Sequence, residues 1–284
     1  MYDKNLETME GMMKKRKKMV FFAVFFAATV ATMSAAAAGK GGKAREVVVG
    51  TGNSFWGFCF LDAKGELVGY ELDVLRAVDE LLPQYRFSFD TAEFRSILVG
   101  LDAGKFDLAA HNYAKNAERQ EKYLYGKVPY GHYNYVIAVK AGRKDINSLK
   151  DLEGKTVSAS SGSNISYYLE NYNKDTAAVP VKIAYGSLDE ETLIKGLEEG
   201  RYDAFFTETK RLTETRRAYG NRVEGVGGTL LPGYTYYIFR KGDEQLRDAV
   251  DKALQTLRSN GTLSKYSSKW FDRDYSGILP DLKP

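Results

Sequence analysis

The sequence predicts an α/β fold built as two lobes that are joined by two connecting strands. Short apolar runs alternate with amphipathic segments of helical period, an order typical of parallel sheets covered by helices. The octapeptide GLDAGKFD at 100–107 returns as GLEEGRYD at 196–203. Extended apolar runs at 134–140 and 230–240 flank the second series of elements, so the chain crosses twice between two series.

Each copy of the octapeptide is expected to end a helix and lead into a strand. Its fifth residue, Gly104 or Gly200, can take the left-handed conformation that closes a helix. The apolar runs that follow, 108–110 and 204–206, are predicted as buried parallel strands. Ligands of open α/β sheets bind beyond the carboxyl ends of such strands. The first site candidates are therefore the residues just after each run, which are His111, Asn112, Tyr113, Thr207 and Glu208. The alternative is that the two octapeptides agree by chance.

The remaining elements follow from the same two periodicities. The first series contains a strand at 47–50, a helix with apolar residues at helical spacing over 72–82, and a strand at 86–89. The second contains a strand at 156–160, a helix near 165–171 and a strand at 181–185, and the capping box Ser187-x-x-Glu190 is expected to open its repeated helix. A last helix at 243–259 should pack on the first lobe.

These elements divide the chain into domains. We expect one lobe to contain residues 45–137 plus 233–284 and the other to contain residues 138–232. A clamp with two connecting strands can close by hinge rotation. Residues 1–38 are predicted as a cleavable signal peptide, because a basic run at 14–18 precedes an apolar run at 19–31 and a small-residue stretch at 35–38. An uncleaved membrane anchor is the alternative.

Composition gives no sign of a charged macromolecular partner. Residues 1–38 hold six of the 41 basic and three of the 37 acidic residues, so the remainder has a net charge of about +1. Neither nucleic acid nor an anionic surface is therefore expected as a partner. Cys59 is the only cysteine, which leaves no intramolecular disulfide and no lipid-modified cysteine after the apolar run. We expect it to be a small buried side chain.

Catalytic and metal-binding motifs are absent from the sequence. It has no GxSxG, Walker, HExxH or paired CxxC motif, and His111 and His132 are its only histidines. Groups that suit a small zwitterion are present instead. Arg119 could bind a carboxylate through two parallel bonds, the segment SSGSN at 160–164 could offer backbone N–H groups at a helix start, and Glu208 could accept an ammonium. Each of these residues alone is ordinarily a solvated charge or a helix cap.

The stretch from about 45 to 275 resembles the polar amino acid solute-binding proteins of ABC importers. The resemblance lies in GTGNSFWGFCFLDAKGELVGYELDVLRAV, NAERQEKYLYGKVPYG, LKDLEGKTVSASSGSN and LEEGRYDAFFTE, which appear in this order. It implies the type II periplasmic-binding fold, a periplasmic location and two partners, a free amino acid and an inner-membrane permease. A monomer without cofactor or metal is expected.

The resemblance also implies roles for individual residues. Phe55 and Phe94 match the aromatic positions on either side of the ligand side chain. Asn112 and Ala114 match backbone-contact positions ahead of the carboxylate-binding Arg119. The second-lobe anion cradle matches Gly162, Ser163 and Asn164, and the ammonium acceptor matches Glu208.

Several positions depart from the family pattern and bear on the ligand. Glu208 replaces the usual aspartate, and Ala114 stands where a serine or threonine is common. Gly52 replaces an acid that members choosing cationic side chains often carry. The segment KYLYGKVPYG is most similar to cystine-binding members, so cystine is the first choice and glutamine or another neutral polar amino acid the second. Glutamate stays open, because Arg95, where cystine-type members usually keep an acid, could reach an anionic side chain; the alternative for Arg95 is a solvated helix residue.

Other classes of function remain as alternatives. The same fold hosts cyclohexadienyl dehydratase, a periplasmic enzyme, and such an enzyme would need a general acid, for which Glu208 or His111 could serve. A sensor-kinase core is disfavoured because no kinase or transmembrane segment precedes the end of the chain at Pro284. A purely structural protein would leave Arg119 and the SSGSN segment without a purpose. The sequence therefore predicts a binding protein rather than an enzyme.

Overall fold

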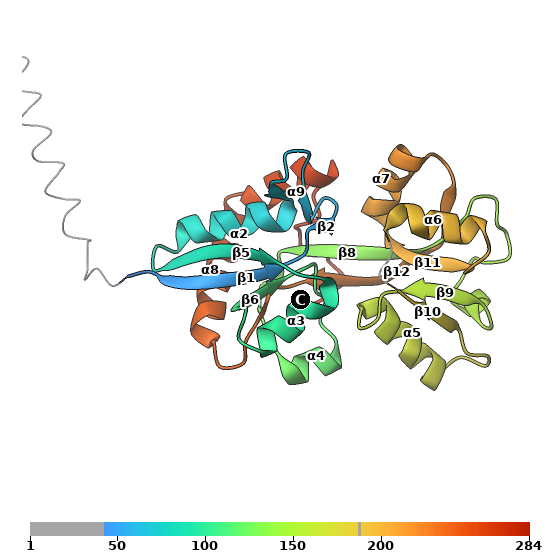
Figure 1. The fold of residues 1–284 in the computed structure, drawn as a ribbon, viewed down its shortest axis with the longest axis horizontal. Coiled ribbons are helices and arrows are strands. Elements are labelled where there is room, and N and C mark those ends of the chain that lie inside the picture. The colour runs from blue at the N-terminus through green and yellow to red at the C-terminus, as the bar shows by residue number, and fades with distance from the viewer. Residues whose placement is uncertain (1–42, 187–188) are drawn as a thin grey trace, which may run out of the picture. The chain divides into compact units, whose positions relative to one another are not determined.

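The computed structural model describes residues 43–186 and 189–284, and the expected signal peptide at 1–38 lies outside them. Residues Arg45–Pro284 form one compact unit. This unit contains two five-stranded sheets and one three-stranded sheet (Figure 1). No helix in the described ranges is long and apolar enough to span a membrane.

The first sheet has the strand order β5-β1-β6-β13-β7. Its strands are β1 (Arg45–Thr51), β5 (Tyr85–Thr91), β6 (Leu108–Ala110), β7 (Leu124–Tyr125) and β13 (Ile238–Phe239). Strand β1 pairs in parallel with β5 and β6, as the alternation of elements predicted. Strand β13 pairs antiparallel with β6 and β7, so the sheet is mixed rather than purely parallel. The antiparallel strand is the one that the chain adds after it has passed through the second five-stranded sheet.

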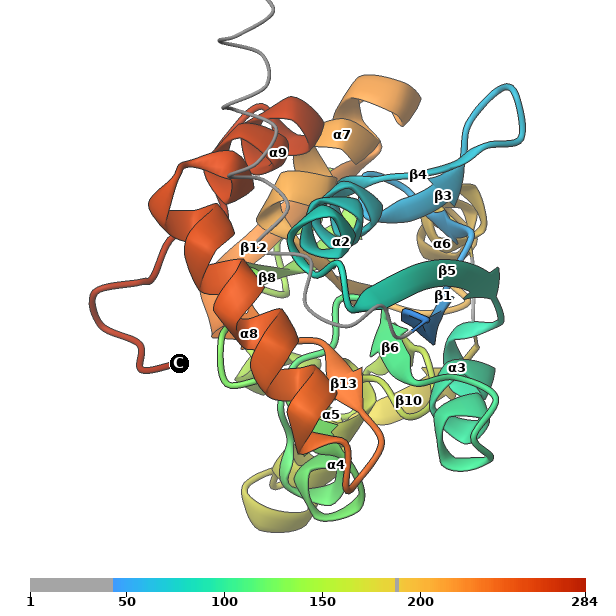
Figure 2. The same cartoon turned by 90° about the vertical axis from the view of Figure 1, so that its left-hand side faces the viewer.

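Helices cover both faces of the first sheet (Figure 2). They are α2 (Tyr70–Leu81), α3 (Phe94–Asp102), α4 (Ala117–Lys122), α8 (Glu244–Ser259) and α9 (Thr262–Phe271). Val47 and Val49 of β1 belong to the core that contains α2 and α8, whereas Val48 packs against the core of α3. This alternation is the period of two expected for a strand buried on both faces. The prediction that the last long helix packs on the first series of elements is confirmed.

The second sheet has the strand order β10-β9-β11-β8-β12. Its strands are β8 (Gly131–Lys140), β9 (Thr156–Ala159), β10 (Lys182–Tyr185), β11 (Ala204–Glu208) and β12 (Val223–Thr235). Strand β9 is parallel to β10 and β11, while β8 is antiparallel to β11 and β12. The packed helices are α5 (Asn164–Asp175), α6 (Glu190–Glu198) and α7 (Thr209–Tyr219), and the 3-10 turn η1 (Lys150–Leu152) precedes β9. The two long strands β8 and β12 run between the two groups of elements (Figure 1).

The predicted cap of α6 is wrong. The N-cap is Asp189, whose side chain accepts a hydrogen bond from the backbone of Thr192. Ser187, the cap predicted from the sequence, lies outside the described residues. An aspartate one residue before the helix can accept hydrogen bonds from the free N–H groups and adds negative charge at the helix start. The sequence therefore contained two candidate N-cap residues, Ser187 and Asp189.

The repeated octapeptide has the same geometry in both copies. Gly104 and Gly200 have φ values of 75° and 70°, which confirms the left-handed helix ends. The last residue of each copy then accepts a hydrogen bond from a neighbouring strand. Asp107 accepts from the backbone N–H of Val48 at 2.8 Å, and Asp203 accepts from that of Thr156 at 2.8 Å. The repeat therefore fixes two helix-turn-strand junctions in register with β1 and β9.

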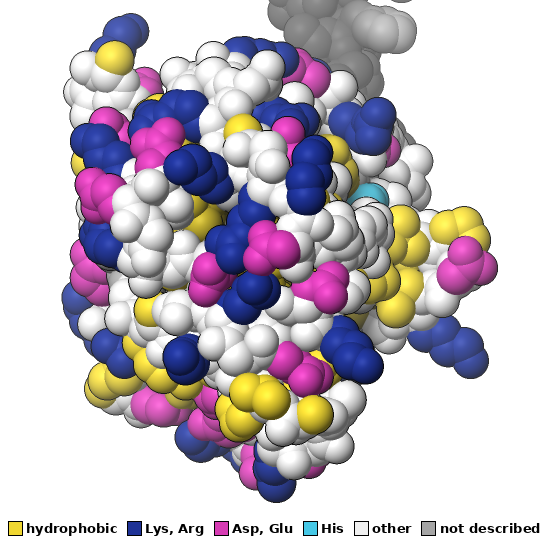
Figure 3. Space-filling model, turned by 90° about the vertical axis from the view of Figure 1, so that its right-hand side faces the viewer, with side chains coloured by type: hydrophobic (Ala, Val, Ile, Leu, Met, Phe, Trp, Pro, Cys, Tyr) yellow, Lys and Arg dark blue, Asp and Glu magenta, His cyan; other side chains and the backbone are white. Residues whose placement is uncertain are grey.

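A three-stranded sheet that the sequence did not predict carries part of the candidate site. Its strands are β2 (Ser54–Phe55), β3 (Cys59–Leu61) and β4 (Leu67–Val68), in the order β2-β3-β4. Cys59, the first residue of β3, is fully buried beside Phe58 and Leu72, as expected for a small core side chain. On the face of the molecule shown in Figure 3, basic and acidic side chains are interspersed.

Candidate functional site

The ends of the two repeated strands meet through a hydrogen bond. Asn112 follows β6, Glu208 ends β11, and the Asn112 side-chain amide donates to Glu208 Oε1 at 2.6 Å. Asn112 is also one of three non-glycine residues with positive φ in the described ranges, at 52°. Asparagine tolerates this left-handed conformation better than most residues. The sequence placed both residues near a ligand, and the structure brings them into contact.

A buried carboxylate holds the backbone of Asn112. Glu71 in the first turn of α2 is fully buried, and its Oε1 accepts the N–H of Asn112 at 2.5 Å and the hydroxyl of Tyr130. Burial raises the pKa of Glu71 to about 7. Sequence reasoning missed this residue. The available signal was an acid on the apolar face of a helix, between the buried residues Tyr70 and Leu72.

Glu208 also has a cationic neighbour from its own segment. Its Oε2 lies 2.8 Å from the ammonium of Lys210, and the two side chains are only 5% and 6% exposed. The orientation is not that of a directed hydrogen bond, so the contact is mainly a charge attraction. The Lys210 ammonium further lies 4.4 to 5.0 Å from three ring centres, those of Phe58, Phe271 and Tyr275. Such rings attract a desolvated cation through their faces.

Arg119 lies at the other end of residues 112–119 from Asn112 and contacts the loop before α5. Its Nη2 donates to the carbonyl of Gly162 at 2.6 Å, and its Nη1 donates to Asn164 Oδ1 at 3.1 Å and to the Ala114 carbonyl at 3.3 Å. The residue is 6% exposed. Its position in α4 is fixed by Asn116, the N-cap, which accepts the Arg119 N–H at 2.8 Å. The predicted carboxylate anchor and the predicted anion cradle are therefore in contact.

The loop at 160–164 has the predicted helix-start geometry. The hydroxyl of Ser163 accepts a hydrogen bond from the N–H of Ser166 and caps α5. Gly162 has a φ of 70°, which lets the loop turn sharply. The groups that face Arg119 are a carbonyl and a side-chain amide oxygen, not the backbone N–H groups that the sequence suggested. Binding of an anion by those N–H groups stays a prediction.

The two predicted aromatic walls both face His111. The imidazole lies 5.3 Å from the Phe55 ring and nearly parallel to it, and 5.1 Å from the Phe94 ring. A β-carbon at Gly52 would come within 2.5 Å of the imidazole, so an acid at this position would displace His111. Burial lowers the pKa of His111 to about 4, which leaves the ring neutral at pH 7. A neutral, weakly basic imidazole is poorly matched to general acid catalysis at that pH.

The site therefore places a guanidinium at one end of residues 112–119 and, near the other end, a carboxylate that is paired with Lys210. Arg119 supplies a guanidinium beside a helix start, and Glu208 supplies a carboxylate beside a left-handed asparagine. Phe55, Phe94 and His111 form an aromatic group, and the Phe94 ring centre lies 6.0 Å from the guanidinium carbon of Arg119. Opposite charges flanked by apolar rings match the carboxylate, ammonium and side chain of an amino acid.

Comparison with known proteins identifies the family of the chain. Residues 47–273 match the family of bacterial extracellular solute-binding proteins, family 3. The chain is 41% identical over 234 residues to the L-cystine-binding protein TcyJ of Bacillus subtilis, covering 82% of this chain and 87% of the relative. It is 36% identical to the L-cystine-binding protein TcyK of the same organism, covering 82% and 86%.

A solved structure shares the fold. It comes from work on glutathione import in Gram-positive bacteria via GshT and the cystine ABC importer TcyBC of Streptococcus mutans. The TM-score is 0.76 at 27% identity, and the match covers 84% of this chain and 100% of the other. These matches span nearly all of the described residues. The chain belongs to the bacterial extracellular solute-binding proteins of family 3, the binding components of ABC importers.

Proposed function

We propose that this protein captures a polar or sulfur-containing amino acid outside the cytoplasmic membrane, with cystine as the first choice, and delivers it to an ABC permease. The observation that carries the proposal concerns residues 112–119. Arg119 at one end contacts the loop at 160–164, and Asn112 at the other end contacts Glu208. The relatives named for cystine binding support the choice of ligand.

The proposed binding mode exchanges protein partners for ligand groups. A ligand carboxylate would replace the Gly162 carbonyl and the Asn164 side chain on Arg119, and the N–H groups at the start of α5 would add to it. A ligand ammonium would replace the Asn112 amide on Glu208. Phe55 and Phe94 would enclose the ligand side chain, with Ala114 and Ser163 beside the carboxylate.

Ligand capture is proposed to couple to closure of two lobes, residues 45–137 plus 233–284 and residues 138–232. Separate apolar cores on the two large sheets and the long strands β8 and β12 support this division. Only a closed state would satisfy both charged ends of one amino acid. Scattering with and without saturating ligand should give a smaller radius of gyration for the bound protein.

We propose a periplasmic location reached through a cleavable signal at residues 1–38, a monomeric state, and no enzymatic activity. The family functions outside the cytoplasm, and the named relatives are binding proteins. The neutral His111 and the paired Glu208 also leave the site poorly equipped for acid catalysis. Mass determination of the mature protein identifies the amino terminus.

Ligand competition tests the function. The purified protein is unfolded and refolded to remove any bound ligand, and its melting temperature is measured with cystine, glutamine, glutamate, arginine and leucine. A ligand at 100 times its dissociation constant adds about 2.7 kcal/mol to stability. Cystine should give the largest shift. A comparable shift with arginine would overturn the argument from Gly52, and tight leucine binding would overturn the choice of a polar ligand.

A further inference from the structure

A small cavity lies beside the candidate site, between α3 and the ends of β9 and β10. Its volume is about 110 Å³, and it is lined by Glu93, Phe94, Arg95, Ser160, Ser161, Tyr185 and Gly186. The cavity is large enough to hold a carboxylate-sized group of a ligand.

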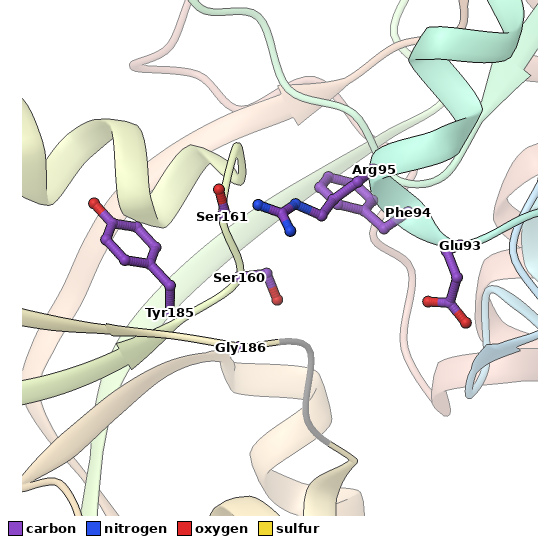
Figure 4. Close-up of a pocket in the computed structure, with 7 residues that line it drawn as sticks. All are labelled: Glu93, Phe94, Arg95, Ser160, Ser161, Tyr185 and Gly186. Atoms are coloured by element: carbon purple, nitrogen blue, oxygen red, sulfur yellow. The ribbon is translucent and has the colours of Figure 1, made fainter.

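The polar groups in the cavity favour an anion. Figure 4 shows the Arg95 guanidinium reaching toward Ser161 and Ser160, while the Glu93 carboxylate points away from it. Within the described ranges, no acidic side chain forms an ion pair with Arg95. The hydroxyl of Tyr185 donates to Glu170 at 2.8 Å, so this ring serves as a wall of the cavity. An exposed guanidinium beside two serine hydroxyls is a donor set for a carboxylate.

The cavity shares two features with the site around Arg119. Phe94 lines the cavity, and its ring centre also lies 6.0 Å from the guanidinium carbon of Arg119. The loop at 160–164 contributes Ser160 and Ser161 to the cavity and the Gly162 carbonyl to Arg119. Arg95 and Arg119 thus share two neighbours, the ring of Phe94 and the loop at 160–164. A ligand that uses both guanidinium groups must carry two anionic groups.

We propose that Arg95, with Ser160 and Ser161, binds a second carboxylate of an extended amino acid whose first carboxylate is held by Arg119. This proposal rests on the proposed function and narrows its substrate class. The ligand class is a diacid with two amino acid ends joined by a flexible linker, and cystine has this structure. Arg95 thereby discriminates a disulfide-linked diacid from amino acids with one carboxylate.

Two ligands that differ only at the distal end test this role. L-cystine carries the second carboxylate, and the mixed disulfide of cysteine with cysteamine lacks it. Wild-type protein should bind cystine at least about tenfold more tightly, because one charge-assisted contact is lost with the mixed disulfide. Arg95→Gln should weaken cystine binding by about tenfold or more and change binding of the mixed disulfide by less than threefold. Calorimetry measures both affinities.

Arg86→Gln is the matched control, because Arg86 is an exposed arginine on β5 that does not line the cavity. It should leave both affinities unchanged. If Arg95→Gln weakens binding of both ligands equally, or of neither, Arg95 does not bind the distal carboxylate. The proposal that the protein binds an amino acid is not affected by that result. The same conclusion follows if wild-type protein binds the mixed disulfide or glutamine as tightly as cystine. If wild-type protein binds no amino acid in the panel, the proposed function fails first.

Discussion

Tyr202 packs so closely on Gly196 that a β-carbon on this glycine would overlap the tyrosine ring. The first copy of the octapeptide has the same relationship, since a β-carbon at Gly100 would come within 2.5 Å of the Phe106 ring. The repeated residues are therefore structural. The first glycine receives the aromatic ring, the second glycine turns the chain, and the aspartate binds the neighbouring strand. The proposed ligand contacts lie in the residues just beyond each copy.

Gly196→Ala should destabilise the protein by about 1–3 kcal/mol, the usual cost of inserting a methyl group into a packed site. The measurement is the free energy of unfolding from urea denaturation. Gly277→Ala is the control, because no atom lies within 4 Å of a β-carbon built there. Adding Tyr202→Leu to Gly196→Ala should cost less than the sum of the two single changes. Strict additivity would show that the ring is not the obstacle.

The sequence predicted the long elements well because their periodicity is strong. The helix at 243–259 and the strands at 47–50, 86–89 and 108–110 appear within one or two residues of their predicted bounds. The small sheet β2-β3-β4 was missed, because strands of two or three residues carry no measurable period. Strand β12 also begins at Val223, seven residues before its predicted start, since glycines interrupt its apolar pattern.

The candidate site was predictable where it follows a motif and unpredictable where distant segments meet. Asn112, Arg119 and Glu208 follow the repeat or the family resemblance. Lys210 was missed because its aromatic neighbours come from widely separated parts of the chain. Glu71 was missed because a helical acid is ordinarily exposed, and only the fold shows that it binds Asn112.

Glu71 should make stability fall as the pH rises. Its pKa is about 7 in the folded protein against 4.5 in an unconstrained chain, so the folded state binds the proton more tightly. The free energy of unfolding therefore loses up to about 1.4 kcal/mol per pH unit between these two values. Glu71→Gln should remove this loss, because a glutamine carbonyl still accepts from Asn112 and Tyr130.

Urea denaturation of wild type and Glu71→Gln at pH 4.5 to 8 measures the effect as the difference between the two curves. Other titrating groups contribute equally to both proteins and cancel in this difference. The variant should gain stability relative to wild type as the pH rises, and the difference should level off above about pH 7. Parallel curves over the whole range would contradict the assigned pKa.

Lys210→Met should destabilise the protein by about 3 kcal/mol. The change leaves the Glu208 carboxylate buried without its cationic partner, which is the costly way to break a buried pair. The double variant Lys210→Met with Glu208→Gln should recover part of the loss, because a neutral amide needs no counter-charge and still accepts from Asn112.

Lys195→Met is the control for this cycle. Lys195 pairs with Glu191 at 2.8 Å, but both side chains are about half exposed. Exposed pairs of this kind contribute at most about 1 kcal/mol. Thermal unfolding of wild type, Lys210→Met, Glu208→Gln and the double variant supplies the cycle, and Lys195→Met is measured beside them. If Lys210→Met is no more destabilising than Lys195→Met, the Lys210 ammonium does not stabilise the buried carboxylate.

Arg119→Ala should lower amino acid affinity by more than tenfold, because truncating one partner of a buried charge pair costs about 2–5 kcal/mol. Arg119→Lys should lose nearly as much, since an ammonium keeps the charge but cannot form two parallel bonds to a carboxylate. Calorimetry with the ligand found in the competition panel measures both losses.

Arg201→Ala is the control, because Arg201 is an exposed arginine paired with Glu199, and this variant should bind normally. Affinity within threefold of wild type in Arg119→Ala would place the carboxylate anchor elsewhere. If Arg119→Lys binds like wild type, positive charge alone is sufficient for ligand binding. The hydrogen bonds from Arg119 to Gly162 and Asn164 would then reflect packing rather than ligand recognition.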